Sequence, residues 1–105
     1  MIKVSFFYLS DGKCKGFKVE GHANSAQYGS DLVCCAVSVA VQMCCNGITD
    51  VLNKKARVKS LNGLVEFDVV EDGDVVQFFL KALELELFNV AQDHKTNLKV
   101  VKLEV

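Results

Sequence analysis

One segment of this chain combines cysteine and histidine in a way that could support nucleophilic catalysis. His22 directly follows Gly21, and Cys34 lies twelve residues later, beyond a stretch of small and polar residues. The thiolate is the reactive form of cysteine, and a neighbouring imidazolium or a helix N-terminus lowers a thiol pKa from about 8.5 to roughly 3.5–7.5. The spacing makes a Cys34–His22 pair one candidate. A packing role for Cys34 and a solvated His22 remain the alternative.

A predicted strand and a predicted helix position these two residues. An alternating strand, Cys14 to Gly21, ends just before His22, and an apolar helix from Leu32 to about Lys54 follows an N-cap at Asp31. We expect Cys34 in the first turn of this helix. The helix dipole contributes only about 0.3–1 kcal/mol, so the imidazole would have to supply most of the activation of the thiol.

Two hairpin turns give the pairing of four strands. Asp11-Gly12 joins Ile2–Leu9 to Cys14–Gly21, and Asn62-Gly63 joins two later strands. Pairing Ser10 with Lys13 also places Cys14 on the solvent face, opposite Leu9. The predicted pairs are Phe6 with Phe17, Val4 with Val19, Ile2 with Gly21 and Lys3 with Glu20, then Val58 with Phe67, Ala56 with Val69, Lys59 with Glu66 and Arg57 with Asp68.

The remaining elements complete an α+β order. A second helix is predicted from Asp74, with Gln77 as a capping partner, to about Asp93, and a last strand from Asn97 to Val105. The order ββαββαβ predicts a five-stranded, mainly antiparallel sheet with two helices packed on it. We interpret residues 1–105 as a single domain.

The cysteines predict packing more than metal or redox chemistry. The chain has five, including the adjacent pairs Cys34-Cys35 and Cys44-Cys45, and no C-x-x-C spacing. Neighbours on a helix point about 100° apart, so neither pair closes a metal site. We therefore expect no metal and no cofactor, with Cys35 toward the core and Cys44 and Cys45 structural. In the first helix the predicted packing residues are Val33, Val37, Val39, Ala40 and Met43.

Charge and hydropathy exclude other classes. A net charge of −1 and a pI near 6.1 argue against nucleic acid as a direct partner. The longest apolar stretch has 14 residues, Leu32 to Cys45, against about 20 for a membrane span. Residues 1–10 lack the features of a signal peptide. We expect a cytoplasmic protein without membrane contact.

The spaced motif around the candidate pair has a family resemblance. The segments Gly21-His22-Ala23, Gly29-Ser30-Asp31-Leu32-Val33-Cys34 and Ala36-Val37-Ser38 resemble the signature of the bacterial ribosomal-processing cysteine protease family, often called Prp. The resemblance extends over the whole length of the chain. It implies that Cys34 is the nucleophile, that His22 is the general base and acid, and that Gly21, Asp31 and Ser38 support them.

The resemblance also implies a substrate, an assembly state and a loop. The substrate is the N-terminal segment of large-subunit ribosomal protein twenty-seven, whose extension the endopeptidase removes during ribosome maturation. The family is homodimeric, with a mobile loop over the site that corresponds to Ala23 to Val33 and includes Gly29 and Ser30. Cys35 departs from the family pattern, where a small residue such as Ala is expected.

Two other functions stay open at this stage. One is a non-catalytic ribosome-associated assembly or interaction module, although the near-neutral charge weakens it. The other is a thiol redox or metal-sensing protein, which the helical spacing of the paired cysteines disfavours.

Overall fold

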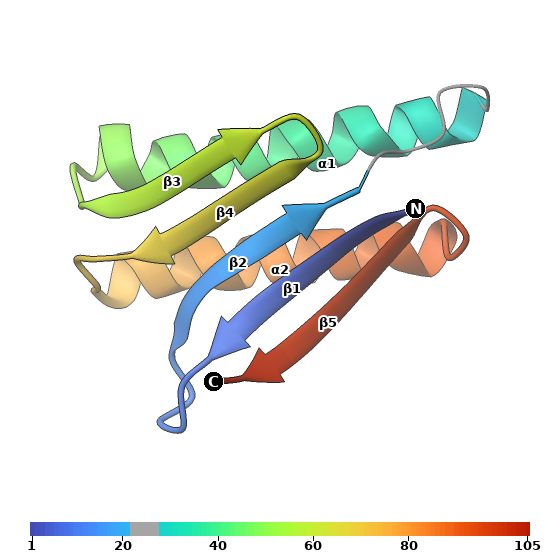
Figure 1. Cartoon of the computed structure of the whole chain (residues 1–105). Helices are drawn as coiled ribbons and strands as arrows, with labels where there is room; N and C mark the ends of the chain where they lie inside the picture. Colours follow the sequence, from blue (N-terminus) through green and yellow to red (C-terminus); the bar gives the residue numbers. More distant parts are fainter. Residues whose placement is uncertain (22–27) are drawn as a thin grey trace.

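The computed structural model describes residues 1–21 and 28–105, with the backbone alone for residues 28–31. The order of its elements confirms the predicted ββαββαβ pattern (Figure 1). The elements are β1 (Ile2–Tyr8), β2 (Cys14–Glu20), α1 (Tyr28–Asn46), a π-helical turn η1 (Gly47–Val51), β3 (Ala56–Leu61), β4 (Leu64–Val69), α2 (Asp74–Asp93) and β5 (Leu98–Glu104).

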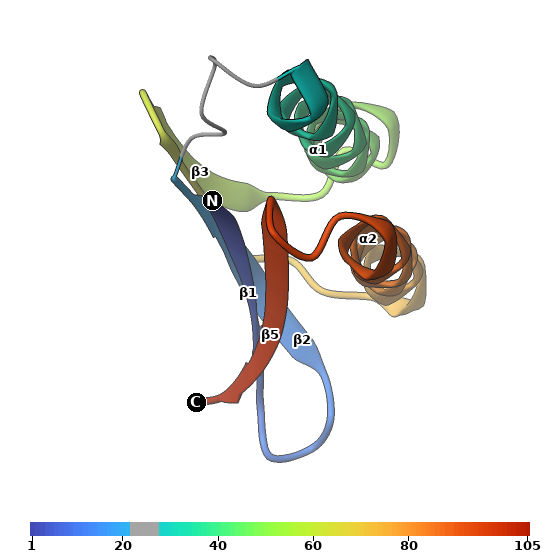
Figure 2. The ribbon, with the colours of Figure 1, turned by 90° about the vertical axis from the view of Figure 1, so that its right-hand side faces the viewer.

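The strands form one mixed sheet in the order β3-β4-β2-β1-β5. Three neighbouring pairs are antiparallel, and β5 runs parallel to β1. Both helices pack on the same face of the sheet, and none of the residues described forms a helix on the other face (Figure 2). The predicted fold class, two helices on a mainly antiparallel five-stranded sheet, is confirmed.

The predicted register holds along most of both hairpins. Phe6 faces Phe17 and Val4 faces Val19, and all four predicted pairs of the second hairpin are present. The register shifts by one residue between Phe7 and Tyr8, so the first turn is longer than the predicted two-residue turn. In this turn the Leu9 N–H donates to the Lys13 carbonyl at 2.9 Å.

This shift corrects the predicted position of Cys14. The residue pairs with Tyr8 instead of Leu9, and its side chain is only 3% exposed. A one-residue slip moves a strand side chain to the opposite face of the sheet. Gln77 does not cap α2 with Asp74 as predicted, but fixes the backbone of Cys14. Its side-chain amide donates to the Cys14 carbonyl at 2.8 Å and accepts from the Cys14 N–H at 2.9 Å.

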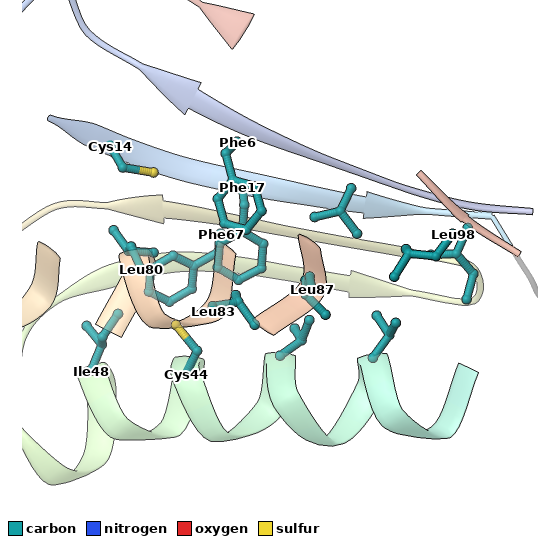
Figure 3. Close-up of a cluster of buried hydrophobic side chains, with 14 of the residues drawn as sticks. Phe6, Cys14, Phe17, Cys44, Ile48, Phe67, Leu80, Leu83, Leu87 and Leu98 are labelled. Atoms are coloured by element: carbon teal, nitrogen blue, oxygen red, sulfur yellow. The ribbon is translucent and has the colours of Figure 1, made fainter. Parts of the chain in front are cut away.

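The core lies between the sheet and the two helices (Figure 3). Phe17 stacks on Phe67 with ring centroids 5.2 Å apart and meets Phe6 at 5.8 Å. The helices contribute apolar stripes at steps of three and four residues, as an amphipathic helix must. The buried stripes are Val33, Val37, Val41, Cys44 and Ile48 from the first helical segment, and Val76, Leu80, Leu83 and Leu87 from α2.

Three expectations about α1 were wrong. The helix begins at Tyr28, so Asp31 lies within it and is not its N-cap. The segment Tyr28–Asp31 is composed of residues common in loops, and the apolar pattern that marks a helix starts only at Leu32. Val39 and Met43 were expected in the core but are 62% and 69% exposed. Cys35 was expected to face the core and is exposed.

Within the described ranges, one stretch, Leu32–Val51, is long and apolar enough to cross a membrane, with a mean hydropathy of 1.8. The core helix of a globular domain passes the same test, and Val33 and Val37 of this stretch pack in the core.

Candidate functional site

Cys34 lies on α1 and lines a cavity between this helix and the sheet. The cavity has a volume of about 290 Å³. Cys34, Ser38 and Gln42 follow one another at steps of four residues, so they share one stripe of the helix. Cys34 is half-buried, whereas Ser38 and Gln42 are exposed. The helix side of the cavity therefore presents a thiol, a hydroxyl and an amide in a row.

The sheet side of the same cavity is mostly apolar. The β3–β4 hairpin supplies Ser60, Leu61, Gly63 and Leu64, of which Leu61 is exposed. Ile2 and Val19, from the ends of β1 and β2, also line the cavity, and Ile2 is buried. The cavity can accommodate apolar side chains next to the Cys34 thiol.

Gly21 is the point at which the chain leaves β2 beside this cavity. Its φ is +96°, which L side chains rarely adopt, and a Cβ there would lie 2.4 Å from the Met1 carbonyl oxygen. The Gly21 N–H donates to the Gly63 carbonyl at 3.0 Å, which ties the strand exit to the hairpin tip. Glycine is required at this position because of both its backbone angle and the close approach of β1.

The other cysteines are in different environments from Cys34. Burial raises the pKa of Cys14 and of Cys45 to about 11, and that of Cys44 to about 12. These three thiols are neutral at physiological pH and lie within or against the core. Cys35 is exposed but does not line the cavity. Cys34 is therefore the one cysteine of the five that is both accessible and in a cavity.

The predicted site residues fall into three groups. Gly21, Cys34 and Ser38 line one cavity. His22 and Ala23 lie outside the described residues. Gly29, Ser30 and Asp31 belong to the backbone of α1, so the predicted loop of Ala23 to Val33 is helical from Tyr28 onward.

The early start of α1 also moves Cys34 out of the first helical turn. It is the seventh residue of a helix that begins at Tyr28. The dipole effect falls off within the first turn, so it contributes little at Cys34. The free backbone amides at the start of the helix lie a full turn before the thiol, and amides inside a helix already donate to the carbonyl four residues earlier.

Two parts of the site had no predicted role. Gln42 follows Cys34 by eight residues, a spacing that places both on one stripe of a helix, but no function was predicted for it. Leu61 and Leu64 flank the Asn62-Gly63 turn, and no local sequence signal indicates that a hairpin tip packs beside α1. Only the strand order, with β4 next to β2, brings it there.

The other cavities that the described residues form hold no accessible thiol: the Cys14 thiol that lines one of them is buried, and another is lined by Asp93 and His94. The largest, about 510 Å³, lies on the outer side of α2 next to β5 and is lined by Leu85 and Phe88. Its carboxylate, Glu84, accepts a hydrogen bond from the Tyr8 hydroxyl and pairs with Lys102 at 3.2 Å. In the part of the chain that the structure describes, no group of three histidine, cysteine or acidic residues could hold a metal ion.

A thiol lining a cavity at the end of a mixed sheet defines a candidate cysteine-dependent site. The family model of the cysteine protease Prp matches residues 1–99. The chain belongs to this family of cysteine proteases.

Solved structures share the fold over almost the whole chain. The essential ribosomal processing protease Prp from S. aureus, in complex with a substrate peptide, has a TM-score of 0.90 and 21% identity, covering 98% of this chain and 100% of that one. The same protein with a covalently linked product peptide has a TM-score of 0.89, 22% identity and the same coverage. SMU.848 from Streptococcus mutans has a TM-score of 0.84 and 22% identity, covering 100% of this chain and 96% of that one. No curated protein matches the chain.

Proposed function

We propose that this chain is an endopeptidase in which Cys34 is the nucleophile and His22 the general base and acid. The observation that carries the proposal is the position of Cys34, which lines a cavity and is accessible there, whereas Cys14, which lines another cavity, is buried. Gly21, to which His22 is covalently joined, lines the same cavity. Membership of the cysteine protease Prp family supports the assignment of the reaction.

The mechanism follows from these two groups. The His22 imidazole removes the proton from the Cys34 thiol, and the thiolate sulfur attacks the carbonyl carbon of the scissile peptide bond. His22 returns the proton to the leaving amine as the C–N bond breaks, which leaves an acyl group on the sulfur. A water molecule, deprotonated by His22, then attacks this thioester, releasing the new carboxylate and restoring the thiol.

Ser38 is positioned to assist this reaction. It lines the cavity one turn beyond Cys34, and its hydroxyl makes no hydrogen bond to any residue that the structure describes. A hydroxyl can donate to the carbonyl oxygen of a bound peptide as negative charge develops on it. Ser38 takes the supporting role that the family resemblance implies. The free backbone amides at the start of α1 lie too far from Cys34 to donate to this oxygen.

The proposed substrate is the N-terminal segment of large-subunit ribosomal protein twenty-seven. The S. aureus structures of the same fold are of a ribosomal processing protease with a substrate and a product peptide. The cavity beside Cys34, mostly apolar on its hairpin side, suits an extended peptide with bulky apolar side chains. The alternative, a non-catalytic ribosome-associated module, requires neither a thiol in a cavity nor a peptide groove beside it.

Cleavage of a peptide spanning the end of the N-terminal extension tests this function. Cys34→Ala is expected to abolish cleavage, a loss of at least 10³-fold, because the nucleophile is removed. Cys35→Ala is the matched control, since its exposed thiol lies outside the cavity, and it is expected to retain activity within about twofold. Cleavage by Cys34→Ala at the wild-type rate would overturn the proposal.

We propose that the protein is a homodimer that forms through the outer face of α1. This face exposes Leu32 and Val39, with 54% and 62% of their surface accessible, and Met43, with 69%. No charged residue occurs from Leu32 to Thr49. An uncharged apolar stripe complements a second copy of itself, whereas the exposed apolar residues of α2 alternate with Lys81, Glu84 and Glu86.

Sedimentation analysis of two variants tests the dimer. Val39→Lys is expected to weaken association at least tenfold, because it buries a lysine from each subunit in the proposed interface. Val75→Lys is the control, at an exposed valine on α2, and is expected to sediment as the wild type does. A monomeric wild-type chain, or equal effects of the two variants, would reject this interface.

The cytoplasm is the proposed compartment. All five cysteines are free thiols, and three of them lie in or against the core. Reducing compartments keep such thiols reduced.

A further inference from the structure

The groove that starts at Cys34 continues along α1 to Gln42. The two residues are eight positions apart on the helix, about 12 Å at a rise of 1.5 Å per residue. An extended peptide covers this distance in about three to four residues. Both residues line one cavity, so a peptide bound at the thiol would also pass the Gln42 side chain.

The two walls of this groove differ in chemistry. The helix wall carries the polar side chains of Ser38 and Gln42, whereas the hairpin wall carries Leu61 and Leu64 and one polar side chain, that of Ser60. The Gln42 amide makes no hydrogen bond to any described residue. Leu61 is 59% exposed, so its apolar surface is also available to a ligand.

Successive side chains of an extended peptide point in opposite directions. In a groove with a polar stripe on its helix wall and a mostly apolar hairpin wall, neighbouring substrate residues therefore meet different chemistry. A primary amide has two donors and one acceptor oxygen, so it pairs with another amide through two reciprocal hydrogen bonds.

We propose that Gln42 is a specificity-determining residue that selects a substrate side chain bearing an amide. The neighbouring substrate side chain packs against Leu61 and Leu64. This inference rests on the proposed function, because it takes the groove beside Cys34 as the place where the peptide lies.

Binding, measured separately from cleavage, tests the role of Gln42. The probe is a set of eight-residue apolar peptides in which one position at a time carries Gln or its near-isostere Met. They are titrated against the Cys34→Ala protein with and without Gln42→Met. Gln92→Met is the matched control, because Gln92 is exposed on α2 and lines none of the cavities described above.

The expected result is specific to one peptide position. Gln42→Met weakens binding of the Gln peptide about tenfold at that position and leaves the Met peptide unchanged or tighter. An equal loss for both peptides would mean that Gln42 binds the main chain or is merely structural, and it would overturn the inference. Unchanged affinities, or no binding to Cys34→Ala, would overturn it too.

The outcome for the proposed function is separate. Cleavage of the preferred peptides by the protein with Cys34 intact tests the protease. Gln42-dependent binding without cleavage rejects the proposed function and keeps the inference. Cleavage of the peptides without any dependence of their binding on Gln42 rejects the inference and keeps the proposed function.

Discussion

Gly21 controls how the chain leaves the sheet next to Cys34. A Gly21→Ala substitution places a side chain at a φ of +96° and puts its Cβ 2.4 Å from the Met1 carbonyl oxygen. We expect unfolding free energy to fall by about 2–4 kcal/mol, from backbone strain and steric overlap together, and peptide cleavage to fall with it. Denaturant unfolding and peptide cleavage measure the two effects.

Alanine substitutions at two other glycines distinguish backbone strain from steric overlap. Gly12→Ala has a positive φ of +88° but nothing within 4 Å of the new Cβ, so it should show only the strain of about 1–2 kcal/mol. Gly73, with extended backbone and open space, should tolerate alanine. Equal effects at all three positions would show that the approach of β1 to Gly21 has no energetic role.

At the scale of elements, the contact of the π-helical turn η1 with α2 depends on Gly47. This residue begins the π-helical turn η1, and a Cβ there would lie 2.5 Å from the nearest ring atom of Phe79. We expect Gly47→Ala to lower the unfolding free energy by about 1–2 kcal/mol, because overlap with the ring outweighs the gain in helix propensity. Chemical denaturation measures the change.

A double-mutant cycle distinguishes steric overlap from a requirement of the π-helical turn itself. Phe79→Leu removes the ring, so Gly47→Ala should cost at least 0.5 kcal/mol less in that background. An identical cost in both backgrounds would locate the effect in the backbone of η1 and contradict the proposed contact.

For the whole molecule, the buried thiols predict a loss of stability at alkaline pH. Burial raises the pKa of Cys14, Cys44 and Cys45 above the ordinary value of 9.0, to about 11, 12 and 11. Because their pKa is higher in the folded state, their contribution is complete below about pH 9 and is lost as pH rises through these values. Each thiol should cost about 1.4 kcal/mol per pH unit in this window.

Urea unfolding at half-unit steps from pH 7 to 11 measures this loss. Cys44→Val removes one titrating thiol from the core at similar volume, so its stability should fall less steeply above pH 9. A free energy of unfolding that does not change between pH 8 and 11 would show that these thiols ionise as easily in the folded state as in the unfolded chain.

Local patterns were sufficient for much of the fold. Alternation and the two turns predicted the strands, and cross-strand charge gave the register of Arg57 with Asp68 and of Lys59 with Glu66. These predictions succeeded because side-chain alternation is a property of each strand and its turn. The position of Cys14 was wrong because a single bulge reverses alternation without changing composition.

The sequence by itself determined the order and type of the elements, and it singled out Cys34 and His22 by their type and spacing. Tertiary structure alone decided that β4 packs between β3 and β2, which brings Leu61 and Leu64 beside a thiol that is far away along the chain. It also decided that the outward stripe of α1 stays exposed. The reason is physical: hydrophobic periodicity specifies which face of an element is apolar, whereas the neighbour that covers this face depends on packing between distant segments.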